Sequence, residues 1–260
     1  MNRIQALFAH KKRDILNIYF TAGYPQRDDT GTVIRSLVAA GVDLIEVGMP
    51  YSDPLADGPT IQESGTQALK NGLTLALLFE QLQAVRRETE VPLVMMGYFN
   101  QVLQYGFDRF LADCVATGID GLILPDLPLY EYQTTYRQQV EDAGLCMSFL
   151  ITPQTTPERI HLVDELSKGF IYMVSSAAIT GAKQGISDEQ VAYFERIAAM
   201  DLCTPRLIGF GISDHATFTK ACAYASGAII GSAYIKALTA GESVEKTTRT
   251  FVAEVKGTIV

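Results

Sequence analysis

The chain has 260 residues, of which 48% are hydrophobic and 19% charged, and its formal net charge is −8. Nonspecific nucleic-acid binding rests on concentrated positive charge, so an acidic chain without a long Lys/Arg cluster is not expected to bind nucleic acid. No apolar run reaches the length of a membrane span, and the first residues lack the apolar core of a signal peptide. These features predict a cytoplasmic protein that does not enter the membrane.

Short apolar runs rich in β-branched residues recur along the chain and predict eight strands. They lie at Ile15–Thr21, Leu44–Gly48, Leu93–Tyr98, Gly121–Pro125, Met147–Thr152, Phe170–Ser175, Arg206–Gly211 and Ala228–Gly231. The runs are nearly continuous rather than alternating, as expected for parallel strands that are covered on both faces.

Segments with helical periodicity separate these runs, and several end in a glycine just before the next strand, which is typical of a helix C-terminus. They lie at Thr30–Ala40, Leu75–Thr89, Phe107–Ala116, Glu131–Ala143, Pro157–Lys168, Asp188–Met200, His215–Ala225 and Ser243–Lys256. Eight strands in alternation with helices predict an α/β protein, a (β/α)8 TIM barrel with eight parallel strands in a single domain over residues 1–260. An open doubly wound sheet is the alternative, but no GxGxxG motif follows the first strand.

Two acidic residues lie close together in the sequence, one within the second predicted strand and one in the loop that follows it. Glu46 lies inside the apolar run, where burial disfavours the charged form and suits a proton carrier near neutral pH, although a structural acid would also fit. Asp57 stands in an Asp-Gly pair, which is also an ordinary turn signal. Because the loops after the strands of a barrel form its active site, both carboxyl groups are expected to reach one small cavity.

Glycine motifs follow the seventh and eighth predicted strands, at 208–213 and 229–233. The loops after these strands are a frequent phosphate site in barrels, since glycines let backbone N–H groups approach an anion. Tight turns alone would also explain Gly211 and Gly231. The long loop 175–185 after the sixth strand is expected to act as a lid.

Other chemistries find little support in the sequence. No lysine lies inside a predicted strand, so a Schiff-base mechanism is not expected. The three histidines are scattered and no CxxC pair occurs, so no metal site is expected. The cysteines at 114, 146, 203 and 222 are expected to be buried, reduced thiols.

Long motifs in this chain are similar to those of the tryptophan synthase alpha chain family. Leu44–Gln62 reads LIEVGMPYSDPLADGPTIQ and carries the family's signature. Further matches occur in the family's order at Ile18–Pro25, Met96–Asn100, Leu124–Pro128, Gly209–Ile212 and Gly231–Ser232. The resemblance covers nearly the whole chain.

The resemblance implies a lyase of tryptophan biosynthesis, which cleaves indole-3-glycerol phosphate to indole and glyceraldehyde 3-phosphate by a retro-aldol reaction. Indole then passes to a beta chain that carries pyridoxal phosphate, in an alpha2-beta2 heterotetramer, while the alpha chain itself uses no cofactor. By the same resemblance, Glu46 is the catalytic acid and base, and Asp57 holds the indole N–H.

The resemblance also implies binding residues. Gly181, Gly211, Gly231 and Ser232 match positions that bind phosphate. The positions lining the indole and glycerol pocket are Phe20, Ile61, Tyr172, Thr180 and Phe210, although barrel packing is an equal explanation for Phe20, Ile61 and Phe210. Asp53 and Pro54 correspond to a region that contacts the beta chain.

One segment departs from the family pattern. Many members carry an Arg and a Gly in the sixth loop, where this chain reads Ser-Ser-Ala-Ala at 175–178. Transfer of lid behaviour and of signalling to the beta chain is therefore less secure than transfer of the catalytic pair. Two alternatives are another phosphate-binding barrel isomerase and a noncatalytic regulatory subunit that binds phosphate metabolites.

Overall fold

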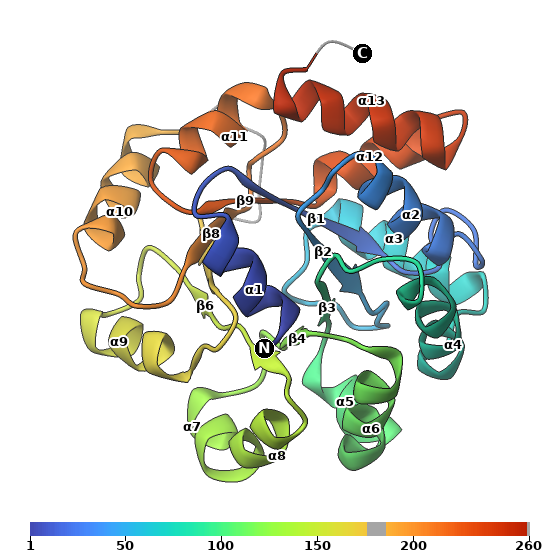
Figure 1. Ribbon diagram of the computed structural model, residues 1–260, viewed down its shortest axis with the longest axis horizontal. Coiled ribbons are helices and arrows are strands. Elements are labelled where there is room, and N and C mark those ends of the chain that lie inside the picture. The colour runs from blue at the N-terminus through green and yellow to red at the C-terminus, as the bar shows by residue number, and fades with distance from the viewer. Residues whose placement is uncertain (176–185, 259–260) are drawn as a thin grey trace.

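The computed structural model describes residues 1–175 and 186–258. Its centre is one curled sheet of parallel strands, with helices around the outside (Figure 1). The strand order is β5-β4-β3-β2-β1-β9-β8-β7-β6. The strands are β1 (Ile15–Thr21), β2 (Leu44–Gly48), β3 (Leu93–Met96), β4 (Gly121–Ile123), β5 (Cys146–Met147), β6 (Leu150–Ile151), β7 (Ile171–Val174), β8 (Arg206–Gly209) and β9 (Gly227–Ile230).

The described residues form nine strands rather than the predicted eight, because the segment expected as one strand at Met147–Thr152 is divided. Its first part, β5, pairs with β4, and its second part, β6, pairs with β7. The two residues between them turn from one neighbour to the other: Ser148 N donates to Leu122 O at 3.0 Å, and Phe149 O accepts from Tyr172 N at 2.9 Å. The two ends of the strand order are therefore joined by two residues of chain, and the sheet curls around to meet itself.

Most predicted helices occur, with ends that shift by a few residues. They are α2 (Thr30–Ala39), α4 (Leu75–Arg86), α6 (Phe107–Thr117), α9 (Pro157–Leu166), α10 (Asp188–Ala198), α11 (His215–Cys222) and α13 (Val244–Lys256). The helix expected over Glu131–Ala143 is divided into α7 (Leu129–Glu131), the π-helical turn η1 (Tyr132–Tyr136) and α8 (Arg137–Asp142). Four further helices were not predicted: α1 (Arg3–His10), α3 (Pro59–Lys70), α5 (Phe99–Tyr105) and α12 (Ser232–Ala240).

The strands separate two apolar clusters. The outer cluster joins alternate strand residues, such as Leu16, Ile18 and Phe20 of β1, to the surrounding helices. The inner cluster contains Ile15 and one or more residues from most other strands, together with two residues of α1. Because successive side chains of a strand point to opposite faces, membership of these clusters shows which strand residues face the interior of the barrel.

Helix α1 crosses the centre of the ring in Figure 1 and closes its amino-terminal end. Ile4 and Phe8 of α1 are buried in the inner cluster beside Ile15, the first residue of β1. One end of the barrel is thus filled with apolar side chains, which leaves the carboxyl ends of the strands for a site.

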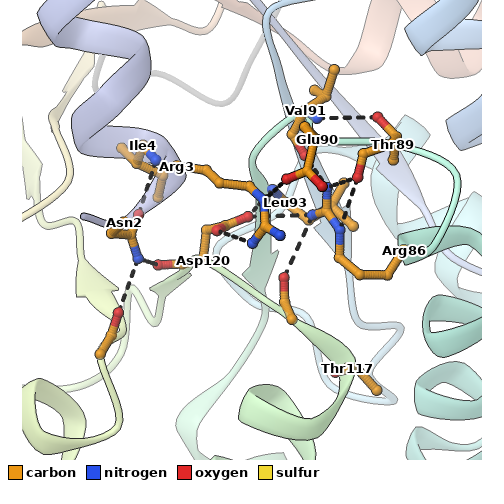
Figure 2. A network of polar contacts seen from close by, with 12 residues as sticks. Asn2, Arg3, Ile4, Arg86, Thr89, Glu90, Val91, Leu93, Thr117 and Asp120 are labelled. Carbon is orange, nitrogen blue, oxygen red and sulfur yellow. Dashed lines mark hydrogen bonds and ion pairs between the residues drawn. The ribbon is translucent and has the colours of Figure 1, made fainter.

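A polar network holds α1 against the neighbouring strands (Figure 2). Asp120, just before β4, accepts from Leu93 N at 2.9 Å and pairs with Arg3 at 3.1 Å and Arg86 at 3.4 Å. Arg3 also pairs with the exposed Glu90 at 2.6 Å. Because Asp120 and Arg86 are almost fully buried, the carboxylate compensates a guanidinium that is largely withdrawn from water.

All four cysteines are free, but the expectation that all are buried is wrong for Cys203. Cys203 lies in the exposed segment before β8, where its backbone N–H donates to Asp164 Oδ2 at 2.9 Å. Among the described residues, no helix is long and apolar enough to cross a membrane.

Candidate active site

Glu46 lies in the middle of β2 and points into the barrel. Leu44 belongs to the inner cluster, whereas Ile45 and Val47 belong to the outer one, so strand alternation places Glu46 on the inner face. The residue has no solvent-exposed surface. Burial raises the pKa of its carboxyl group to about 8, against a smaller lowering effect of a hydrogen bond from Asn17. Both protonation states are therefore accessible near neutral pH.

The two carboxyl oxygens of Glu46 differ in their contacts. Asn17 Nδ2 donates to Oε1 at 2.6 Å, whereas Oε2 has no hydrogen-bond partner among the described residues. Asn17 is itself fully buried in β1. A buried acid with one oxygen held and one free can give or accept a proton at the free oxygen.

The aromatic residue of β1 that faces the barrel interior is Tyr19 rather than Phe20. Phe20 is fully buried in the outer cluster, against the helices. Tyr19 is the register partner of Glu46, and nearby Asp57 and Glu46 both contribute, after burial, to raising the pKa of its phenol. The sequence analysis therefore named the neighbour of the inward-facing residue. The polar Asn17 could have indicated the correct residue, because residues 17 and 19 of a strand share one face.

Asp57 lies in the loop between β2 and α3, held in place by hydrogen bonds from two sides. Tyr98 Oη donates to Asp57 Oδ2 at 3.3 Å, and Gln62 Nε2 donates to Asp57 O at 2.8 Å. The side chain is half-buried. Burial raises the pKa of Asp57 to about 6, and the bond from Tyr98 opposes this increase. The group is therefore mainly ionised at pH 7.

Tyr172 and Phe210 line the opposite side of the barrel. Tyr172 in β7 belongs to the inner cluster, and its ring meets that of Phe210 edge to face at a centroid distance of 6.1 Å. Glu46, Tyr19 and Asp57 all contribute, after burial, to raising the pKa of the Tyr172 phenol. One interior region therefore contains groups from β1, β2, β7 and the loop after β2.

The turn after β8 has unusual backbone geometry. Phe210 has a φ of 66° and Gly211 a φ of 77°, a conformation that costs energy for residues other than glycine. Ser175 Oγ donates to Phe210 O, which ties the end of β7 to this turn. A strained non-glycine residue beside a site is commonly retained for function.

Gly231 and Ser232 form the start of α12, directly after β9. A Cβ atom on Gly231 would lie 3.3 Å from Tyr19 Cδ1, so the backbone runs close against the pocket aromatic. The first turn of a helix has backbone N–H groups without intrahelical partners, and these favour an anion. The end of β9 thus combines a glycine in close contact with Tyr19 and the N-terminus of α12, an arrangement chemically suited to an anion.

The remaining expected residues lie at the edge of the site or outside the described residues. Ile61 is half-buried in the first turn of α3, and its carbonyl oxygen accepts from Ser64 Oγ at 2.9 Å. Asp53 is exposed, Pro54 is half-buried, and the neighbouring Leu55 has 87% of its surface exposed. Thr180 and Gly181 lie outside the described residues. Within 1–175 and 186–258, no cluster of three or more His, Cys, Asp or Glu side chains is arranged to hold a metal ion.

Comparison with known proteins identifies one family. The family model described as tryptophan synthase alpha chain matches residues 5–259. Among curated proteins, the tryptophan synthase alpha chain of Parabacteroides distasonis is 52% identical, with 95% of this chain and 97% of the relative covered. The alpha chain of Flavobacterium psychrophilum is 53% identical, with 98% and 100% covered.

Solved structures give the same result at lower identity. Tryptophan synthase from M. tuberculosis in an aminoacrylate-bound form matches with a TM-score of 0.85 and 33% identity, over 98% of both chains. A tryptophan synthase complex from Pyrococcus furiosus matches with a TM-score of 0.86 and 31% identity, over 95% of this chain and 99% of that one.

Proposed function

The chain belongs to the tryptophan synthase alpha chain family, and on that premise we propose that Glu46 and Asp57 carry out its lyase reaction. The reaction cleaves indole-3-glycerol phosphate to indole and glyceraldehyde 3-phosphate. The observation that carries the assignment is Glu46: a fully buried, inward-facing acid with a pKa of about 8 and one free oxygen. An acid whose pKa lies near the working pH transfers protons in both directions with little penalty.

The chemistry follows from the substrate. The Glu46 carboxyl group protonates indole C3, which gives an indolenine whose C=N bond can accept an electron pair. The resulting Glu46 carboxylate removes the proton from the hydroxyl group on the adjacent glycerol carbon. That carbon becomes the aldehyde of glyceraldehyde 3-phosphate, and the electrons of the breaking C–C bond pass into the ring to restore indole. Glu46 ends in its starting protonation state.

Asp57 serves the other end of the ring. Its carboxylate accepts a hydrogen bond from the indole N–H and stabilises the positive charge that develops there when C3 is protonated. Its pKa of about 6 keeps it mainly ionised at pH 7, whereas Glu46 is mainly protonated there. Two carboxyl groups in one site are thus divided into a proton donor and a charge stabiliser by their surroundings.

The other residues hold the substrate. Tyr19, Ile61, Tyr172 and Phe210 enclose its ring and glycerol. The amides at Gly181, Gly211, Gly231 and Ser232 bind its phosphate group, and Thr180 belongs with the residues around the ring and glycerol.

The assembly is also inferred from the family. Asp53 and Pro54 lie in the loop that would contact a beta chain, and pyridoxal phosphate would be bound by that partner alone, in an alpha2-beta2 complex of the cytoplasm. We infer that β5 and β6 together act as one interrupted strand. The chain is then an eight-stranded barrel in a single domain over 1–260. Copurification and sedimentation with a beta chain test the assembly; absence of a complex would refute it.

An indole-release assay tests the activity. Wild-type protein should release indole from indole-3-glycerol phosphate in buffer containing a metal chelator. Glu46→Gln should abolish release but leave substrate binding largely intact, and Asp57→Asn should lower turnover about a hundredfold or more without loss of the fold. Undiminished turnover by Glu46→Gln would refute the assigned role.

A further inference from the structure

Glu46 has an immediate neighbour that the proposed reaction leaves without a role. Asn17 is fully buried in β1, on the face that also contains Ile15 and Tyr19. Its register partners are Leu44 of β2 and Ile229 of β9, both residues of the inner apolar cluster. A polar amide in an otherwise apolar layer costs free energy unless it is hydrogen-bonded.

The hydrogen bond that Asn17 makes is directed at the catalytic acid. Nδ2 donates to Glu46 Oε1 at 2.6 Å, and Asn17 Oδ1 has no partner among the described residues. A residue kept only for packing would not need an amide here, since Leu has a similar volume and suits the surrounding Leu44 and Ile229.

We propose that Asn17 is a positioning residue for Glu46, which holds Oε1 by its amide and thereby makes Oε2 the oxygen that exchanges protons with substrate. The proposal rests on the proposed function of Glu46 and goes beyond it by assigning different tasks to the two oxygens. Fixing one oxygen also fixes the plane of the carboxyl group, and catalytic groups lose efficiency when displaced by as little as 1 Å.

The chemistry of an amide suits this task better than that of a cation. A neutral donor favours the carboxylate moderately, whereas Lys or Arg at this position would hold the acid ionised. The phenols of Tyr19 and Tyr172 lie near Glu46, and the carboxyl group of Asp57 lies near both phenols. Burial raises the pKa of Glu46, and the hydrogen bond from Asn17 opposes this increase. The bond therefore brings the pKa closer to neutral pH.

Asn17→Leu tests the proposal, because it removes the donor at nearly constant volume. We expect kcat for indole release to fall roughly tenfold to a hundredfold with little change in KM, since the substrate contacts remain. The titration midpoint of Glu46 should rise by about one pH unit. The midpoint is measured on substrate-free protein by NMR of ¹³C-labelled glutamate carboxyl groups, with the Glu46 signal identified by its absence in Glu46→Gln.

Two further variants complete the test. Thr248→Val is the control, because Thr248 is also fully buried but lies in α13, where its hydroxyl contacts that of Tyr234 at 2.7 Å; it should leave the Glu46 midpoint unchanged. Asn17→Asp is the alternative if Asn17→Leu does not fold, because Asp has the same shape as Asn. It places a second carboxyl group in direct contact with Glu46, which should raise the titration midpoint of the pair and broaden its titration. An unchanged Glu46 midpoint in the folded Asn17 variants would overturn the positioning role, whatever Glu46→Gln does to activity.

Discussion

Tyr98 holds Asp57 through hydrogen bonds to two adjacent loop residues: its hydroxyl donates to Asp57 Oδ2 at 3.3 Å and accepts from Ala56 N at 2.9 Å. Tyr98 follows β3 and is the N-cap of α5, so a rigid strand end supports an otherwise exposed loop. The contact orients the carboxyl group and stabilises its charged form. Tyr98 therefore acts on Asp57 in the way that Asn17 acts on Glu46.

The first prediction is that Tyr98→Phe makes activity more sensitive to acid. The hydrogen bond lowers the pKa of Asp57, so its loss should raise that pKa above about 6 and reduce the ionised fraction as pH falls. Indole release should drop about twofold to fivefold more at pH 6 than at pH 8. The measurement is the pH profile of kcat/KM. Tyr51→Phe is a matched control, because Tyr51 stacks on Tyr98 but its hydroxyl contacts Asn100. An equal loss at every pH would contradict the electrostatic role.

The second prediction concerns stability and follows from the raised pKa of Glu46. The folded protein keeps this acid protonated up to about pH 8, whereas in the unfolded chain it ionises near 4.5. The folded state therefore binds more protons in that window, and its stability falls as pH rises through it, by up to roughly 1.4 kcal/mol per pH unit. Glu46→Gln removes this dependence. The free energy of unfolding of the variant, relative to that of wild type, should therefore increase from pH 5 to pH 8.

Urea unfolding at several pH values measures this difference in the free energy of unfolding. Glu245→Gln is the control, because Glu245 is an exposed residue of α13 and should produce no such trend. A constant difference between wild type and Glu46→Gln across the window would show that Glu46 is ionised in the folded protein.

The sequence predicted the alternation of strands and helices well, because the apolar runs and glycine helix ends are local signals. β1 and β2 have the predicted bounds, and the acid within β2 was recognised by its apolar surroundings. The division at β5 and β6 was not predictable in this way. It depends on Ser148 and Phe149 bonding to different neighbours, a relationship between residues far apart in the chain.

The helices that were missed have weak local signals. α3 is mostly polar and exposed, although Pro59 at its first position after Gly58 is a typical helix start. α1 was missed because a short apolar face at the N-terminus is a weak helix signal by itself. This face is explained only by the folded barrel, whose open end Ile4 and Phe8 fill.

The third prediction is that Asp120→Asn destabilises the fold but spares the chemistry. Asp120 and Arg86 have only 3% and 9% of their side-chain surfaces exposed, so loss of the carboxylate leaves a buried guanidinium without its counter-charge. The free energy of unfolding should fall by about 3 kcal/mol, with kcat unchanged at a temperature where the variant is folded. Glu90→Gln is the matched control, because Glu90 pairs with Arg3 but is 85% exposed, so its loss should cost far less free energy of unfolding. Equal costs for the two variants, measured by urea unfolding, would contradict this account.

The last prediction separates two neighbouring aromatic residues on opposite faces of β1. Tyr19 lies beside Gly231 on the inner face, whereas Phe20 packs in the outer cluster. Tyr19→Leu should raise KM for indole-3-glycerol phosphate severalfold, because it removes an aromatic surface from the pocket. Phe20→Leu should instead lower the free energy of unfolding by roughly 1 to 2 kcal/mol through a small cavity, with KM unchanged. Steady-state kinetics and urea unfolding of both variants distinguish these effects. A raised KM in Phe20→Leu alone would restore the assignment made from the sequence and would mean that β1 is rotated by one residue, which would also move Asn17 away from Glu46.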